Sequence, residues 1–238
     1  MAFAKPKYDP NLTQVTLQAR LAISPTLSLS KPDATLDITL GLRISNTAYS
    51  GEPVTILTHR SAFEVFGDDG IDMFARGAFG AIRALDNDNQ PMDKQISLGF
   101  FRVNEVVNSD SPDLRERGYQ FLTIPGDGSE VAVTHRLSWE RIFKYEEKLS
   151  RHDLTPGERF SISVNERYIG TSWWCLGDLE GVLRDKKFHS WTTDEFGEQR
   201  PDDNFLRKGN WALGRNPKEL YWAVDKVSNE EAVFEIVD

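Results

Sequence analysis

Two similar stretches of sequence constrain the fold most. Residues 121–133 and 154–164 each carry a Pro-Gly pair, Pro125–Gly126 in the first and Pro156–Gly157 in the second, between apolar residues and an alternating segment. Proline fixes φ at the first turn position, and glycine accepts the left-handed conformation that follows. The alternation then directs every second side chain to one face of a strand. Such stretches are typical of antiparallel β-sandwiches.

The clearest predicted strand covers residues 35–45, where apolar and polar side chains alternate strictly. Its apolar residues share one face: Leu36, Ile38, Leu40, Leu42 and Ile44. Similar patterns predict strands at residues 13–23, 53–58, 159–165 and 233–237, and a strand pair within 121–133. Residues 79–85 are expected to face residues 96–103 across a polar loop at 86–89.

One segment departs from the strand pattern. Ser138 is a helix-start residue, and an acidic first turn and spaced apolar residues follow it, which predicts a short helix at about 139–150. The sequence as a whole predicts an all-β, immunoglobulin-like antiparallel β-sandwich of about eight or nine strands with this helix inserted. We expect residues 1–170 to form the sandwich domain. Residues 171–238 are expected to form a Trp-rich C-terminal extension that packs on it and closes with a strand.

Charge and cysteine content exclude several classes of protein. The net charge is −9, which disfavours nucleic acid as a partner because phosphate binding needs a basic face. Cys175 is the only cysteine, so a disulfide-stapled secreted domain is excluded. The first ten residues lack the apolar core of a signal peptide, and no apolar run is long enough for a membrane helix. We therefore expect a cytoplasmic protein without a membrane partner.

Two stretches resemble known proteins. Residues 36–57, a strand, an Asn-Thr turn and a second strand, look like the opening of the small β-sandwich domains found beside deuterolysin-type fungal metalloproteases and in intracellular proteinase-inhibitor-like domains. Residues 154–164 with the following 170–174 resemble a group of uncharacterised fungal cytosolic proteins with this sandwich and a Trp-rich tail. The His-Glu-x-x-His protease motif is absent, so the resemblance implies the fold and a fungal-type intracellular origin but no protease activity.

The Trp-rich segment is the first candidate site. Trp173, Trp174 and Trp191 are candidate binding residues for a small molecule, with Asp178 and His189 as candidate acid-base groups. A carboxylate beside aromatic walls can have a raised pKa and act as an acid. The alternative is that these rings cap one end of the sandwich as core residues. Adjacent residues of a strand point to opposite faces, so at most one of Trp173 and Trp174 can enter a given pocket.

Other chemistry has weaker support. Two acidic clusters, Asp68–Asp69 with Asp72 and Asp86 with Asp88 and Asp93, lack the EF-hand pattern and are interpreted as turns. The four histidines lack metal-site spacing, so no metal is predicted. Cys175 is expected to be a buried structural thiol. No phosphate-binding loop or nucleophile elbow is present, and no cofactor is predicted.

The leading functional hypothesis is therefore a non-enzymatic intracellular binding or interaction module whose partner is an unknown small molecule or protein. The alternative is a cofactor-independent small-molecule enzyme, an isomerase or cyclase of secondary metabolism that uses the Trp-lined pocket. The two differ in what they require. A ligand site needs a concave cavity with convergent polar groups, whereas an interaction module needs an exposed apolar patch or a bare sheet edge.

Overall fold

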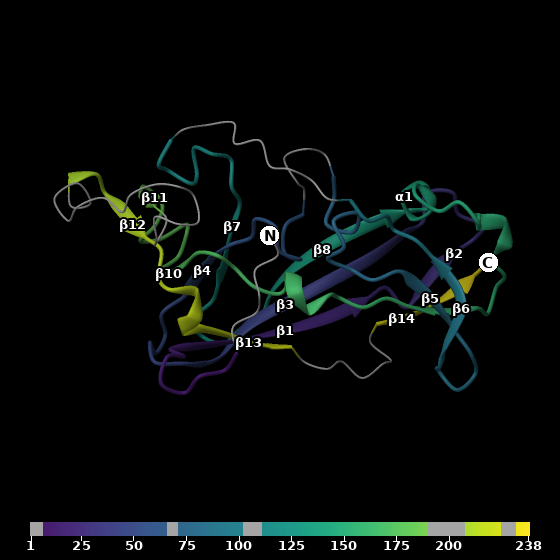
Figure 1. The fold of residues 1–238 in the computed structure, drawn as a ribbon, viewed down its shortest axis with the longest axis horizontal. Helices are drawn as coiled ribbons and strands as arrows, with labels where there is room; N and C mark the ends of the chain where they lie inside the picture. Colours follow the sequence, from purple (N-terminus) through teal and green to yellow (C-terminus); the bar gives the residue numbers. More distant parts are fainter. Residues whose placement is uncertain (1–6, 66–70, 102–110, 190–207, 225–231) are drawn as a thin grey trace.

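The computed structural model describes residues 7–65, 71–101, 111–189, 208–224 and 232–238. These ranges form fourteen strands, one α-helix and three 3₁₀ helices (Figure 1). The all-β prediction is confirmed. Seven of the ten strand pairings in these ranges are antiparallel and three are parallel, so the sheets are mixed where purely antiparallel pairing was predicted. The immunoglobulin-like strand order stays a prediction.

The longest strands form a four-stranded sheet through the centre of the molecule (Figure 1). Its order is β13 (Leu220–Val224), β1 (Val15–Ile23), β3 (Thr35–Thr47) and β8 (Val131–Ser138). The alternation predicted for residues 35–45 is observed in β3, whose even-numbered apolar residues from Leu36 to Ile44 are all buried. One face of this sheet therefore lies on the core, and the other carries polar side chains.

A five-stranded sheet supplies the opposite wall of the core. Its order is β2 (Thr26–Ser28), β14 (Val233–Val237), β9 (Arg159–Ser161), β5 (Ile82–Leu85) and β6 (Pro91–Ile96). Its inner face is apolar, and Phe160 stacks on Phe234 there with ring centroids 5.7 Å apart. Residues of both sheets belong to one buried cluster, which gives the sandwich-like arrangement.

Two smaller sheets extend the fold at one end (Figure 1). The three-stranded sheet has the order β10 (Trp174–Leu176), β4 (Val54–Leu57) and β7 (Phe121–Ile124), and the two-stranded sheet pairs β11 (Lys187–His189) with β12 (Trp211–Leu213). β10, β13 and β14 all follow residue 170, yet each pairs with strands that precede it. These three strands of the C-terminal segment thus form backbone hydrogen bonds with strands of residues 1–170.

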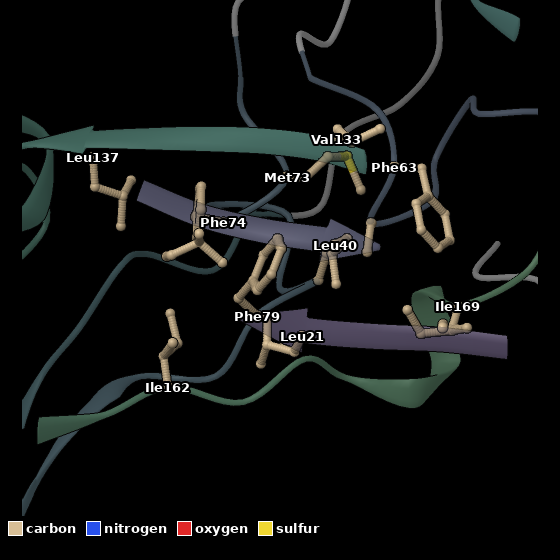
Figure 2. Packing of buried hydrophobic residues seen from close by; sticks show 14 of the residues in the cluster. Leu21, Leu40, Phe63, Met73, Phe74, Phe79, Val133, Leu137, Ile162 and Ile169 are labelled. Carbon is tan, nitrogen blue, oxygen red and sulfur yellow. The ribbon is translucent and has the colours of Figure 1, made fainter. Parts of the chain in front are cut away.

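The main core is closed by the connection between β4 and β5. Phe63, Met73, Phe74 and Phe79 come from this connection and pack against Leu40 and other side chains of the four-stranded sheet (Figure 2). A second, smaller cluster lies under the short C-terminal strands and contains Leu57, Leu114, Trp173, Cys175, Leu183, Phe188 and Ala212. The many aromatic residues of the sequence therefore divide between two cores.

Two predicted strand pairings are corrected. The strands of residues 121–133 exist, but they do not pair with each other: β7 pairs with β4 and β8 with β3. A hydroxyl–hydroxyl hydrogen bond of 2.9 Å between Thr55 and Thr123 joins β4 to β7. The hairpin predicted between residues 79–85 and 96–103 forms instead between β5 and β6. Asp86 sets this register, because its carboxylate accepts the N–H groups of Asp88 at 2.9 Å and Gln90 at 2.8 Å and tightens the turn.

The predicted helix is shorter than expected. α1 spans only Trp139–Phe143, and Ser138 caps it by accepting the N–H of Arg141 at 3.2 Å. Beyond its end, the Glu146 carboxylate accepts the backbone N–H groups of Lys148 and of Ser97, which holds this part of the chain in a non-helical conformation. Three 3₁₀ turns occur later, at Arg151–Asp153, Glu166–Tyr168 and Pro217–Glu219. Within the described ranges, no helix has the length and apolar character needed to cross a membrane.

Candidate functional site

The predicted aromatic site consists of core side chains. Trp173 and Trp174 both have no exposed surface, and they point into different clusters, as expected for neighbours on a strand. The Trp173 Nε1–H group donates to the His189 carbonyl oxygen at 2.7 Å, and its ring stacks on Phe188. The Trp174 Nε1–H group donates to the carbonyl oxygen of Asn216 at 2.9 Å. The core interpretation of these two rings is therefore the correct one.

Two further predicted site residues, His189 and Asp178, have structural contacts of their own. His189 is only 2% exposed, and its ring meets the Trp211 ring edge-on with centroids 5.6 Å apart. The Asp178 carboxylate accepts the N–H of Glu180 at 2.9 Å and so stabilises a turn. Trp191 lies outside the described residues. Gly214 packs so closely on the Trp173 indole that a Cβ atom there would collide with its Cδ1 and Nε1 atoms.

The acidic and thiol candidates have structural roles. Asp86 and Asp88 lie in the turn described above, which confirms the turn interpretation for these two residues, whereas Asp93 lies in β6. Asp68–Asp69 lie outside the described ranges. Burial opposes ionisation of Asp72, but hydrogen bonds from Arg141 and the N–H of Ala75 hold the pKa of its carboxyl below the usual range. Burial raises the pKa of Cys175 to about 12, which makes its thiol unreactive. Among the described residues, no three or more His, Cys, Asp or Glu side chains gather in a metal-binding group.

A buried polar pair occurs at positions that belong to no recognised sequence motif. Glu64, 3% exposed, lies 3.2 Å from Nδ1 of His59 and also accepts the N–H of Arg60 at 2.8 Å. Arg60 has φ of 57°, and the His59 ring lies 4.5 Å from the Tyr119 ring. The carboxylate thus holds a strained turn in place. The pair therefore orders this turn. Because His59 is only 8% exposed and Glu64 3%, the two side chains are not accessible to a substrate.

The feature with the shape of a ligand site lies on the outer face of the five-stranded sheet. It is an open cleft of about 530 Å³ over β5 and β9 that reaches the ends of β13 and β14. The strand register explains its lining. Ala84 and Phe160 are opposite one another and point into the core, so Arg83 and Ser161, the next opposite pair, point outward into the cleft.

The walls of the cleft combine apolar and polar groups. Leu85, Val224 and Val233 supply apolar surface. The guanidinium of Arg83 and the hydroxyls of Ser161 and Ser163 supply hydrogen-bonding groups. The two sides of the cleft floor are held together by the N–H of Gly80, which donates to the Ser163 carbonyl oxygen at 2.8 Å. None of these residues stands out in the sequence, because an outward polar residue on an alternating strand is the ordinary pattern for a solvated face.

A second hollow, of about 600 Å³, lies between β6 and residues 145–149. Two of its charged side chains, those of Lys94 and Glu146, are already engaged. Lys94 Nζ lies 2.5 Å from Glu158 Oε1 and also donates to the carbonyl oxygen of Asp153, and the Glu146 carboxylate accepts two backbone N–H groups. A charged residue paired in this way on an edge strand protects the sheet edge against association. The cleft on the outer sheet face is therefore the stronger candidate.

Comparison with known proteins adds no assignment. No protein-family model matches the chain, and a search of curated proteins finds no significant match. The resemblance to fungal β-sandwich proteins accordingly stays a prediction, and the function has to be argued from the cleft.

Proposed function

We propose that the chain is a non-enzymatic binding module whose ligand occupies the cleft over β5 and β9. The observation that carries the proposal is the cleft itself, about 530 Å³ in volume and lined by both apolar and hydrogen-bonding side chains. Sites for small molecules are typically clefts of roughly 300–1,000 Å³ with a few polar groups among apolar ones. The cleft fits a small molecule better than a protein surface, which needs a broader apolar area.

The alternative, a cofactor-independent isomerase or cyclase, has less support. It requires an open aromatic pocket, and Trp173 and Trp174 are fully buried. Its proposed acid, Asp178, is occupied with a backbone N–H. The described residues that line the outer cleft include no His or Cys, and their one acidic residue, Glu166, already has an interaction partner. Binding without chemistry is the simpler use of such a surface.

The cytoplasmic location and the absence of nucleic-acid and membrane partners belong to the proposal as well. Their support is the net charge of −9 and the single buried thiol of Cys175. Fractionation of cells that express the tagged chain would test the location, and recovery of the chain with membranes or chromatin would contradict it.

The proposal is tested by screening a fragment library that contains neutral, cationic and anionic compounds. Binding is followed by ¹H–¹⁵N chemical shifts of the full chain. We expect at least one compound to cause saturable shifts at the amides of Leu85, Ser161 and Ser163. The variant Ser161→Phe fills the cleft with a ring on an outward strand position and should abolish these shifts.

The matched control is Ala132→Phe, which places the same ring on the exposed outer face of β8, away from the cleft. It should leave binding unchanged. The proposal fails if no compound in the library perturbs the cleft amides in a saturable way, or if the two variants reduce binding equally. Both variants keep the side chains of the core, so thermal unfolding verifies that each protein is folded.

A further inference from the structure

Arg83 is unusual among the arginines that the structure describes. Most of them have an acceptor, such as Glu130 for Arg20, the Asn89 amide oxygen for Arg159 or the Asp72 carboxylate for Arg141. Arg83 projects from β5 into the cleft, and none of the described residues accepts a hydrogen bond from its guanidinium or forms an ion pair with it. Its five N–H donors are therefore available to a ligand.

Two hydroxyl groups lie on the same surface as this guanidinium. Ser161 is directly opposite Arg83 in the β5–β9 ladder, which places their Cβ atoms about 5 Å apart. Ser163 lies further along the same chain segment, and its Oγ would be 3.0 Å from a Cβ atom at Gly80. Neither hydroxyl has a hydrogen-bond partner among the described residues. The polar side of the cleft thus presents a fork of N–H donors with two rotatable O–H donors beside it.

The charge available to a ligand is positive. Glu166 is the only acidic residue that lines the cleft within the described ranges, and this residue has an interaction partner. Arg83 has none, so its charge is not neutralised locally. The whole chain carries −9, so long-range attraction does not favour anions, and any preference for them has to come from direct contact with Arg83.

The rest of the cleft suits the apolar part of a small molecule. Leu85 lies beside Arg83 on β5, and Val224 and Val233 mark the ends of β13 and β14 where they border the same cavity. A ligand with its charged group at Arg83 would place an aliphatic or aromatic group on this surface. Such a division of polar and apolar contacts fixes the orientation of a ligand.

We infer that the ligand of the cleft is an organic carboxylate, which Arg83 holds in a bidentate contact while Ser161 and Ser163 donate to the remaining lone pairs. This inference rests on the proposed function. A carboxylate fits better than a phosphate because one free guanidinium balances a single negative charge, and the planar fork matches two coplanar oxygen atoms. A dianion would leave one charge uncompensated in the cleft.

The test uses three compounds that share a phenylpropyl skeleton: 3-phenylpropanoate, its neutral amide and the corresponding amine. Dissociation constants are measured at pH 7 from the amide shifts of Ser161, Ser163 and Val233. We expect the carboxylate to bind roughly threefold to tenfold more tightly than the amide, since an exposed ion pair contributes little and a bidentate one more. The amine should bind most weakly. The advantage of the carboxylate should shrink as salt is added.

Two variants locate the effect. Arg83→Gln should make the carboxylate and the amide bind equally, and Arg83→Lys should restore only part of the difference because lysine lacks the planar fork. Arg43→Gln removes the same charge from the outer face of β3 and should change nothing.

The outcomes separate the two proposals. Equal binding of all three compounds in the unaltered protein, or the same loss in Arg83→Gln and Arg43→Gln, would overturn the carboxylate and leave the binding module standing. If only neutral or cationic compounds of the wider library cause saturable shifts at the cleft amides, the carboxylate inference is also overturned and the binding module still stands. If no compound perturbs the cleft amides, the binding module fails together with the inference.

Discussion

Replacing Trp173 with phenylalanine tests most directly whether the aromatic segment is core. The indole is fully buried in the smaller cluster, where it stacks on Phe188 and meets Phe121 edge-on. Its Nε1–H group donates to the carbonyl oxygen of His189 at 2.7 Å. Trp173→Phe keeps an aromatic ring in place but removes this donor and part of the buried ring volume.

The expected loss of stability follows from these two contributions. The void left by the smaller ring costs about 1–2 kcal/mol. An acceptor left without its partner costs about 1–3 kcal/mol, and the lower end applies because the His189 carbonyl oxygen keeps a bond of 3.0 Å from the N–H of Gly214. The free energy of unfolding should therefore fall by about 2–3 kcal/mol. A replaced ring in an open pocket would change it by less than about 0.5 kcal/mol.

Urea unfolding followed by far-ultraviolet circular dichroism measures this difference. Gly214→Ala is the independent variant, because its new methyl group would collide with the Trp173 ring, and we expect a loss of about 1–3 kcal/mol. The cost of Gly214→Ala should be smaller in the Trp173→Phe background, where the Nε1 atom is gone. If both single variants are as stable as the unaltered protein, the core interpretation of Trp173 is wrong.

Three further outcomes are expected from buried polar groups. Burial lowers the pKa of His135 below its ordinary value of 6.5, so its neutral ring contributes full stability above pH 6.5, and the free energy of unfolding should fall as the pH drops below that value. Urea unfolding between pH 5 and 8 measures this dependence, and His135→Gln should flatten it. Glu64→Ala removes the acceptor for the His59 ring and the Arg60 N–H group and should lower the free energy of unfolding by about 2–3 kcal/mol, whereas an unchanged denaturation midpoint would show that the pair is dispensable. Cys175 should react with a thiol reagent at least about 100-fold more slowly in the folded than in the unfolded protein, and fast labelling under native conditions would contradict its burial.

Strands with strict alternation were predictable because their sequence alone carries the signal. The predicted segment 35–45 lies within β3, 13–23 contains β1, and 233–237 coincides with β14. In the first two of these segments, a period of two in the apolar residues reports one buried face, whereas residues 233–237 are apolar at four of their five positions. The short strands after residue 170 were not predicted individually, because a three-residue strand such as β10 is too brief to show a period.

Strand partners and helix length depended on information that no local pattern holds. The Pro-Gly turn within 121–133 predicts a hairpin, but β7 and β8 belong to different sheets. α1 ends after five residues, and the segment that follows it is held by a hydrogen bond from the Ser97 N–H to Glu146, 49 positions away in the chain. Likewise, the side chain of Arg83 was indistinguishable in sequence from any outward residue of a strand. Its lack of a partner becomes visible only when its neighbours in space are known.

The cleft and the core are built on opposite faces of the same strands, and this separates the tests of function from the tests of folding. Arg83 and Ser161 point outward, whereas Ala84 and Phe160 between them point into the core. Arg83→Gln should therefore change ligand preference while leaving the free energy of unfolding within about 0.5 kcal/mol. Trp173→Phe should do the reverse, lowering stability without changing the affinity of the folded protein for a carboxylate. Trp173 belongs to the smaller cluster, which contains none of the residues that line the cleft, so altered binding in both variants would contradict this separation.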